Sequence, residues 1–324
     1  MDVLVAIFSD TEAWTMPAAC VEELRRRFPG IRFMHAANDE AMERLIPTAD
    51  VAFTSRLTPR AFAAARALRW VHSPAAGVGS MLFPAMKASP VVLSNSRGMN
   101  AAAVAEHALM LMLAALRRLP EAVRAQADRR WVADGLSGLP SLRGRTLLVV
   151  GLGAIGQETA RMASALGMRV VGTRREAGVS PPCGVDEAYA PEDLPRLLPA
   201  ADIVVLTAAL TAETRGMIGA AELALMKRSA WLVNVARGKL IDERALVAAL
   251  EEGTIAGAAL DVVEHEPLSA ASPLWSMPNV IVTPHVAGFR EDYWAAAVDL
   301  FAANLERFLA GEPVANVVDK QAGY

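Results

Sequence analysis

A glycine-rich turn between two apolar runs constrains the fold of this chain more than any other feature. The run of residues 146–150 leads into the turn, residues 151–156, and a helical pattern then leads to a second run, residues 168–171. This order predicts a strand, a turn, a helix and a second strand beside the first. The unit is typical of folds that hold the pyrophosphate of a dinucleotide at the start of a helix.

The three glycines of this turn have the spacing that a pyrophosphate site requires. Gly151 permits the tight turn, Gly153 lets the backbone approach the phosphates, and Gly156 lets the helix pack closely on the strand. Ala154 and Ile155 begin the helix, whose first N–H groups and positive dipole favour an anion. We therefore expect these five residues to contact a dinucleotide.

The end of the second strand indicates which dinucleotide is preferred. A unit that binds NAD usually has Asp or Glu about 20 residues after the glycines, to accept hydrogen bonds from the ribose 2′-OH. Here that stretch reads Thr173-Arg174-Arg175, and the first acidic residue is Glu176. Because guanidinium groups pair with phosphate, we expect NADP(H) to be preferred and NAD(H) to be possible. The alternative is that both arginines are solvated charges at a strand end.

Bulk properties exclude several classes of protein. The chain has 324 residues, enough for about two domains, with 53% apolar and 21% charged residues. A net charge of −3 gives no basic footprint for nucleic acid. The longest apolar stretch, residues 101–116, is interrupted by Glu106 and His107 and is too short for a membrane span. We expect a cytoplasmic protein with no nucleic-acid or membrane partner. Cys20 and Cys183 lack metal or redox spacing, and no metal is expected.

Two stretches of alternating apolar runs and helical patterns predict two α/β domains. Because strands that alternate with helices form parallel sheets, the fold class is two Rossmann- or flavodoxin-like doubly wound domains with a cleft between them. Strands are expected near residues 2–8, 31–35, 50–53, 70–72 and 91–93, and again near 146–150, 169–172, 202–207, 230–235, 256–261 and 279–283.

The domain boundaries follow from the segments around these stretches. A long apolar helix, residues 100–119, is expected to begin at Asn100 as its N-cap and to end before Pro120. Residues 120–145 are polar and are expected to form a loop. A final helix and the tail after it can return to the first domain. We therefore expect a discontinuous substrate domain, 1–99 plus 289–324, and a dinucleotide-binding domain, 100–288.

Three ionisable residues follow predicted strands of the second domain. Arg237, Glu266 and His285 each come just after an apolar run. Because ligands of open parallel sheets bind at the carboxyl edge, we expect these three residues to share one site. An arginine fork suits a substrate carboxylate, a histidine suits proton transfer, and a neighbouring carboxylate favours the imidazolium. Each residue alone could equally be an ordinary loop residue. No chemistry is assigned to the other histidines, His35, His72, His107 and His265.

Taken together, these motifs resemble the D-isomer-specific 2-hydroxyacid dehydrogenases, which include glyoxylate and hydroxypyruvate reductases. The resemblance rests on separated segments in the right order: residues 151–156, Asn234-Val235-Ala236-Arg237-Gly238, residues 259–267, Thr283-Pro284-His285, and the helix around Glu106-His107. It implies the reversible reduction of a 2-oxo acid to a D-2-hydroxy acid by hydride transfer from a nicotinamide cofactor, and Thr173-Arg174-Arg175 favours NADPH.

The resemblance also implies residue roles. Arg237 would hold the substrate carboxylate and carbonyl oxygen, His285 would donate the proton, and Glu266 would pair with His285. Asp261 would accept hydrogen bonds from the nicotinamide carboxamide. The loop of residues 75–78 would offer N–H groups to the substrate carboxylate, chiefly at Ala76 and Gly77. The remaining expected cofactor contacts are Thr173, Arg174, Arg175, Ala208, Val235, Ala236 and Gly288.

Alternatives to this function remain open. The same fold occurs in a nucleotide-sensing, corepressor-like binding protein, which would bind the cofactor without turnover. A phosphonate-oxidising relative is a further alternative, whereas Glu266-Pro267 argues against a formate dehydrogenase. The resemblance implies a homodimer, for which the apolar helix and Trp131 on the following segment are candidate contacts.

Overall fold

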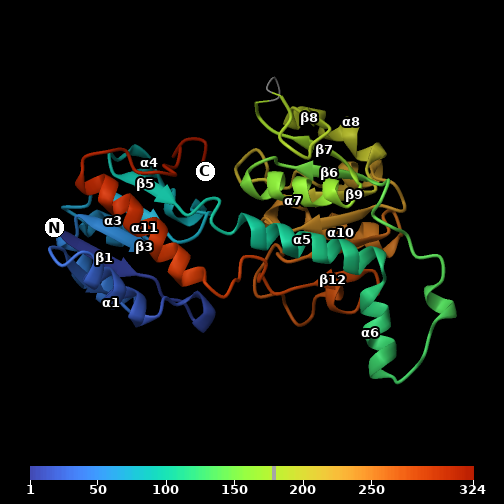
Figure 1. Cartoon of the computed structure of the whole chain (residues 1–324), viewed down its shortest axis with the longest axis horizontal. Helices are drawn as coiled ribbons and strands as arrows, with labels where there is room; N and C mark the ends of the chain where they lie inside the picture. Colours follow the sequence, from blue (N-terminus) through green and yellow to red (C-terminus); the bar gives the residue numbers. More distant parts are fainter. Residues whose placement is uncertain (177–179) are drawn as a thin grey trace. The chain divides into compact units, whose positions relative to one another are not determined.

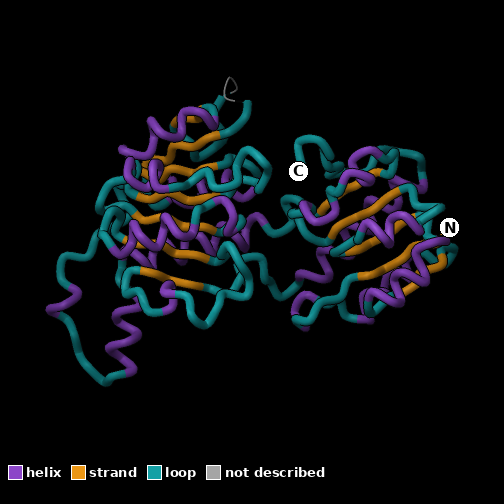
Figure 2. The backbone as a smooth tube through the Cα atoms, turned by 180° about the vertical axis from the view of Figure 1, so that it is seen from behind, coloured by secondary structure: helices purple, strands orange, loops and turns teal. Residues whose placement is uncertain are grey.

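The computed structural model describes residues 1–176 and 180–324. The chain divides into two compact units, Met1–Met99 with Arg290–Tyr324, and Asn100–Phe289. The second unit thus ends one residue later than the boundary expected from the sequence. Each unit is built on one sheet whose strands all run parallel, and Figure 2 shows each sheet as a single layer with helices around it. The predicted α/β class with two doubly wound domains is confirmed.

The first unit has a five-stranded sheet in the order β2-β1-β3-β4-β5. Its strands are β1 (Asp2–Ala6), β2 (Arg32–His35), β3 (Val51–Thr54), β4 (Trp70–Ser73) and β5 (Val92–Asn95). Its helices are α1 (Ala18–Arg27), α2 (Asp39–Leu45), α3 (Pro59–Ala64), α4 (Pro84–Ala88) and α11 (Tyr293–Leu309). Apolar clusters fill both faces of the sheet, as expected for strands that are buried on two sides.

Helix α11 supplies part of the core of this unit from the far end of the sequence. The Phe301 ring stacks on Phe53 of β3 with a centroid separation of 4.3 Å, and on Trp70 of β4 at 5.4 Å. Figure 1 shows α11, in red, among the blue elements of the N-terminal segment. The tail then pairs with β5, where Val318 N donates to Leu93 O over 2.8 Å. Residues 1–99 therefore do not complete this core alone.

The second unit has a seven-stranded sheet in the order β12-β11-β10-β9-β6-β7-β8. Its strands are β6 (Thr146–Val150), β7 (Arg169–Thr173), β8 (Glu187–Tyr189), β9 (Ile203–Leu206), β10 (Trp231–Asn234), β11 (Gly257–Leu260) and β12 (Val280–Val282). Its helices are α5 (Ala101–Leu116), α6 (Leu119–Ala127), α7 (Ala154–Ala165), α8 (Leu194–Leu197), α9 (Ala220–Leu225) and α10 (Glu243–Glu251). The order of the strands along the sheet changes direction between β9 and β6. Ligands of such sheets usually bind at this point, outside the carboxyl ends of the strands.

Two local predictions are wrong, and both have a physical reason. Strand β8 was not expected, because its three half-exposed residues form no apolar run. Residues 120–145 were expected to form a loop, yet they include most of α6. Pro120 does follow the end of α5, but proline is also favourable in the first turn of a helix, and Arg118 in a left-handed conformation (φ 50°) separates the two helices. Asn100 does precede α5, but its side chain makes no capping hydrogen bond.

Candidate active site

Two glycines of the turn, Gly151 and Gly156, have no room for a side chain, whereas the space at Gly153 is open. A Cβ atom at Gly156 would lie 2.2 Å from Gly151 O, and one at Gly151, where φ is 103°, would lie 2.7 Å from Ala208 Cα. Gly153 and Ala154 are exposed at the start of α7, and Ile155 is half-buried. The turn thus brings backbone N–H groups to the surface at a helix N-terminus, which fits a dinucleotide pyrophosphate. Ala208 borders this turn directly.

Arg174 and Arg175, which follow β7, differ in their burial. Thr173 is buried and its carbonyl accepts a hydrogen bond from Leu152 N over 2.8 Å, which ties this strand end to the glycine turn. The Arg174 guanidinium is half-buried and donates to Ser180 O over 3.0 Å, whereas Arg175 is exposed. Both arginines therefore lie just past the strand adjacent to the glycine turn.

Arg237 stands on a tightly packed turn after β10. Asn234 braces this turn, because its side chain accepts from Ala236 N and donates to Arg237 O, both over 3.0 Å. Gly238 is required, since a Cβ there would lie 1.9 Å from the Val263 carbonyl. The Arg237 guanidinium makes one hydrogen bond to a described residue, to Ala236 O over 2.6 Å. The acceptor of this positively charged group is therefore a neutral backbone carbonyl. Asn234 is a bracing residue to which the sequence assigned no role.

Glu266 and His285 form a direct pair. His285 Nδ1 lies 2.6 Å from Glu266 Oε2, and the two side chains are 40% and 37% exposed. Glu266 Oε1 also accepts from Val263 N over 3.2 Å. Burial acts to raise the pKa of Glu266, but the hydrogen bond and charge of His285, the Val263 N–H and the charge of Arg237 outweigh it and lower that pKa. Glu266 is thus a carboxylate kept ionised beside an imidazole.

The charges of Arg237 and Glu266 each shift the pKa of the other group. Burial lowers the pKa of Arg237, and the charge of Glu266 partly opposes that shift. A guanidinium that has lost water without gaining a full set of acceptors favours an incoming anion. The structure therefore brings together, at one sheet edge, an anion-binding cation and a carboxylate–imidazole pair.

Asp261 lies just past β11 and fastens the segment that carries His285. Its side chain is 1% exposed; Oδ1 accepts from Val286 N over 3.0 Å and Oδ2 from Ala287 N over 2.9 Å. Val235 and Ala236 are buried after β10, and Gly288 follows the fastened segment. Asp261 therefore has a structural role that the sequence did not suggest. So does His107 on α5, whose Nε2 lies 2.9 Å from Thr283 Oγ1.

In the first unit, the loop with Ala76 and Gly77 is held by its carbonyl oxygens. Ser73 O accepts from Ser96 Oγ over 3.0 Å, and Ala75 O accepts from Ser96 N over 3.4 Å. Pro74 O accepts from the buried Tyr293 hydroxyl over 3.1 Å. Ala76 O accepts from the Asn95 amide over 2.7 Å.

The N–H groups of this loop are used differently from its carbonyls. Those of Ala76, Gly77 and Val78 make no hydrogen bond to a described residue. A loop whose carbonyls face the protein presents its N–H groups outward, and successive outward N–H groups form a concave site for anions. The loop at Ala76 and Gly77 is therefore suited to a carboxylate.

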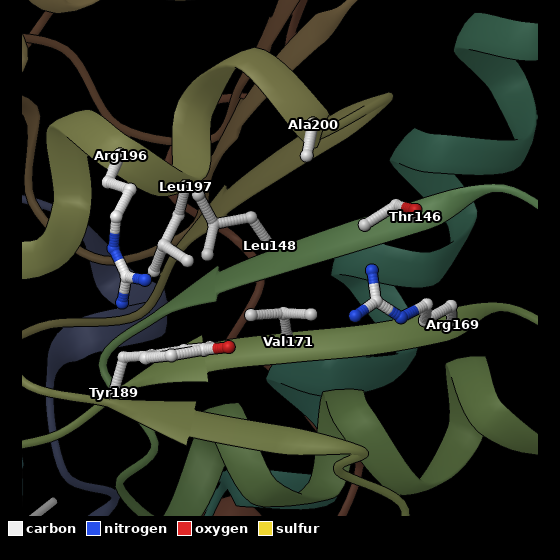
Figure 3. Close-up of a pocket in the computed structure, with 8 residues that line it drawn as sticks. All are labelled: Thr146, Leu148, Arg169, Val171, Tyr189, Arg196, Leu197 and Ala200. Atoms are coloured by element: carbon white, nitrogen blue, oxygen red, sulfur yellow. The ribbon is translucent and has the colours of Figure 1, made fainter.

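The remaining histidines and a separate cavity do not belong to this site. His72 is fully buried, and burial lowers its pKa to about 3. A cavity of about 160 Å³ lies between strands β6–β8 and α8 (Figure 3). Its two guanidiniums, Arg169 and Arg196, already pair with Glu187 and Asp193, and Thr146 and Arg169 are the first residues of their strands. None of Arg237, Glu266 and His285 lines this cavity.

The described part of the chain has neither a metal-binding cluster nor a membrane-spanning helix. Residues 1–176 and 180–324 contain no group of three or more His, Cys, Asp or Glu side chains placed to hold a metal ion. Within the same residues, no helix has both the length and the apolar character needed to span a membrane.

Comparison with known proteins identifies the family. Residues 109–287 match the model of the NAD binding domain of D-isomer specific 2-hydroxyacid dehydrogenases. The chain is 36% identical to the glyoxylate reductase of Korarchaeum cryptofilum over 274 residues, which covers 83% of this chain and 81% of that protein. It is also 36% identical to the D-3-phosphoglycerate dehydrogenase of Methanocaldococcus jannaschii over 288 residues, 87% of this chain. That match spans about half (53%) of the relative.

Solved structures agree over nearly the full length of both chains. The NADPH-dependent glyoxylate/hydroxypyruvate reductase of Sinorhizobium meliloti, in complex with NADP and sulfate, has a TM-score of 0.85 at 31% identity, covering 100% of this chain and 99% of that one. A D-isomer specific 2-hydroxyacid dehydrogenase from Xanthobacter autotrophicus Py2, in complex with NADPH and MES, has a TM-score of 0.85 at 32% identity, covering 99% of both chains.

The fold and the nucleotide-binding unit define an NAD(P)-dependent oxidoreductase. The chain belongs to the family of D-isomer specific 2-hydroxyacid dehydrogenases, as the sequence motifs predicted.

Proposed function

We propose that this protein reduces a small 2-oxo acid to a D-2-hydroxy acid, reversibly, with NADPH. The observation that carries the proposal is the Glu266–His285 pair beside Arg237, whose guanidinium has one acceptor among the described residues, the neutral Ala236 O. A 2-oxo acid has the two groups that such a site handles, a carboxylate for the guanidinium and a ketone oxygen for the proton donor. The family relatives named glyoxylate reductase support the same class of substrate.

The chain's own residues divide the reaction into binding and proton transfer. Arg237 would hold the substrate carboxylate and polarise the carbonyl oxygen. In the first unit, the N–H groups at Ala76 and Gly77 are proposed as carboxylate-binding groups. His285 would donate a proton to the carbonyl oxygen, and ionised Glu266 would stabilise the imidazolium and fix its orientation. Bound NADPH would supply the hydride to the carbonyl carbon. In the reverse direction, neutral His285 would accept the hydroxyl proton.

The dinucleotide would lie on the glycine turn of the second unit. Gly151, Gly153, Ala154, Ile155 and Gly156 would contact the pyrophosphate, because they form the turn at the start of α7 and the space at Gly153 is open. Asp261 would accept a hydrogen bond from the nicotinamide carboxamide through Oδ2, which accepts one hydrogen bond from a described residue. The other proposed contacts are Thr173, Arg174, Arg175, Ala208, Val235, Ala236 and Gly288.

A substrate panel run with both cofactors tests this function. Purified protein is expected to oxidise NADPH in the presence of glyoxylate, hydroxypyruvate or a longer 2-oxo acid, and to form the D isomer of the product. Measured tight binding of NADPH with no turnover of any 2-oxo acid would instead support a non-catalytic, nucleotide-sensing protein.

The preference for NADPH should depend on the arginines after β7. We expect Arg174→Asp with Arg175→Ser to lower kcat/KM for NADPH about 10- to 100-fold, and to change that for NADH far less, because a 2′-phosphate loses charge-assisted hydrogen bonds. Arg169→Ser, at the opposite end of the same strand, is the matched control. An unchanged ratio of the two cofactors in the double variant would show that neither arginine contacts the 2′-phosphate.

A homodimer is the assembly that the exposed apolar residues favour. Trp131 is 97% exposed, and further large apolar side chains are exposed along α5 and α6: Met110, Leu113, Leu119 and Val123. Figure 1 shows α6 and the segment after it extending away from the rest of their unit. Large exposed aromatic residues are typical anchors of protein interfaces.

Sedimentation tests the dimer. Trp131→Ala is expected to raise the dissociation constant at least about tenfold, because a buried aromatic anchor contributes about 2 kcal/mol or more. Trp275→Ala, which removes an exposed tryptophan from a different segment, should leave the constant unchanged. A wild-type protein that sediments as a monomer at micromolar concentration would rule out this assembly.

A further inference from the structure

His107 makes a polar contact with the segment that carries the proposed proton donor. It comes from helix α5, where it follows Glu106 in an apolar sequence, and its side chain is 14% exposed. Its Nε2 lies 2.9 Å from Thr283 Oγ1 and 3.4 Å from Asp261 Oδ1. Thr283 stands two residues before His285. Through His107, helix α5 therefore makes a polar contact with the segment that carries His285.

The hydrogen-bond chemistry sets the direction of this contact. Thr283 Oγ1 lies 2.6 Å from Asp261 Oδ1, and an ionised carboxylate only accepts hydrogen bonds. The single hydroxyl hydrogen of Thr283 is therefore donated to Asp261. Thr283 Oγ1 can then only accept from His107, so the proton of the His107 ring lies on Nε2. The chain of donors runs from His107 through Thr283 to Asp261.

Asp261 in turn determines the backbone on both sides of His285. Asp261 O accepts from His285 N over 2.8 Å, and its carboxylate accepts from the next two backbone N–H groups, Val286 and Ala287. His285 has a φ of 54°, the left-handed region that non-glycine residues seldom adopt. Such a conformation persists when the surrounding contacts require it. Here most of the backbone contacts come from Asp261, and His285 N also lies 3.0 Å from Thr283 O.

We propose that His107 is a positioning residue that holds the His285 imidazole in its reactive orientation through Thr283 and Asp261. The proposal rests on the proposed role of His285 as proton donor. His107 donates to the Thr283 hydroxyl, and that hydroxyl neutralises part of the Asp261 charge while fixing the carboxylate against the 285–287 backbone. Loss of the donor leaves Thr283 and Asp261 free to turn, and the His285 backbone loses its single defined conformation.

The two substitutions His107→Gln and His107→Leu separate positioning from packing. Both replace the ring by a side chain of similar length, but only glutamine can donate an N–H to Thr283. We expect His107→Leu to lower kcat for the 2-oxo acid about 10- to 100-fold, the effect of small misplacements of a reacting group, with KM changed less than about threefold. His107→Gln should retain kcat within about threefold. His35→Leu, on the exposed end of β2, is the control.

A second variant and a readout without turnover complete the experiment. Thr283→Val removes the same hydroxyl link, so the double variant with His107→Leu should lose no more kcat than either single one. Hydrogen exchange of residues 283–289 should accelerate in His107→Leu and Thr283→Val, and should stay at the wild-type rate in His107→Gln and His35→Leu. This measurement tests the positioning even if the protein reduces no 2-oxo acid.

The opposite results would overturn the proposal. Wild-type exchange of residues 283–289 in His107→Leu would show that His107 does not hold this segment. Equal loss of kcat in the glutamine and leucine variants would show that the N–H donor is not the important property. Additive losses in the double variant would show that His107 and Thr283 act separately.

Discussion

Arg237→Lys is expected to lower kcat/KM for a 2-oxo acid by about 10²- to 10³-fold, which corresponds to about 3–4 kcal/mol of transition-state stabilisation. Lysine keeps the positive charge but offers no planar fork, so it cannot hold a carboxylate through paired hydrogen bonds while also reaching the carbonyl oxygen. The Arg237 guanidinium has one described acceptor, Ala236 O, so most of its donors are available to a substrate. Steady-state kinetics with a 2-oxo acid gives the measurement.

The control for this prediction is an arginine with the same substitution on the surface. Arg228→Lys, on an exposed residue, should leave kcat/KM unchanged. The affinity of Arg237→Lys for NADPH, measured by cofactor fluorescence, should stay within about twofold of wild type. If Arg237→Lys kept kcat/KM within about threefold, Arg237 would not be the carboxylate clamp.

His285→Gln is expected to lower kcat by about 10²- to 10⁴-fold, the usual contribution of a general acid–base residue. Glutamine can still donate a hydrogen bond to the carbonyl oxygen, but it cannot transfer a proton. Substrate binding should change much less than kcat, since Arg237 remains. Single-turnover measurement of NADPH oxidation isolates this step from product release.

Glu266→Gln provides the second half of that test. The pKa of Glu266 is lowered, because the hydrogen bond and charge of His285 outweigh the effect of burial, so Glu266 is a carboxylate at neutral pH. Because reduction needs Glu266 as a carboxylate, wild-type kcat should fall as the pH drops through the lowered pKa of Glu266. Glu266→Gln should have a lower kcat and should lack this acid limb. A wild-type pH profile in Glu266→Gln would contradict the role of this carboxylate, and near wild-type kcat in His285→Gln would contradict the proton donor.

The class of fold and the grouping of Glu266 with His285 could be predicted because they follow from local patterns. Apolar runs mark buried strands, and residues after parallel strands share one edge of the sheet. The geometry of the glycine turn is also determined locally, because a Cβ atom at Gly151 or Gly156 would collide with the backbone. These features need no knowledge of distant contacts.

The features that were missed depend on contacts between residues far apart in the sequence. Tyr293 supports Pro74 from 219 positions away, and His107 reaches Thr283 across 176 positions. No periodicity links such residues, and a histidine on an apolar helix has no local signal that separates a hydrogen-bonded group from a packed one. Strand β8 was missed because it is short and half-buried, and helix α6 because it has a proline in its first turn and buries only Ala125.

The position of α11 in the first unit determines the order in which this protein can fold during synthesis. The ribosome releases residues 1–99 first, but Phe53 and Trp70 are covered only when Phe301 arrives with α11. The second unit, residues 100–289, emerges complete before α11 does. The N-terminal segment must therefore wait, with an apolar sheet face uncovered, while a later domain folds. That interval is when the nascent chain is most exposed to aggregation and most in need of a chaperone.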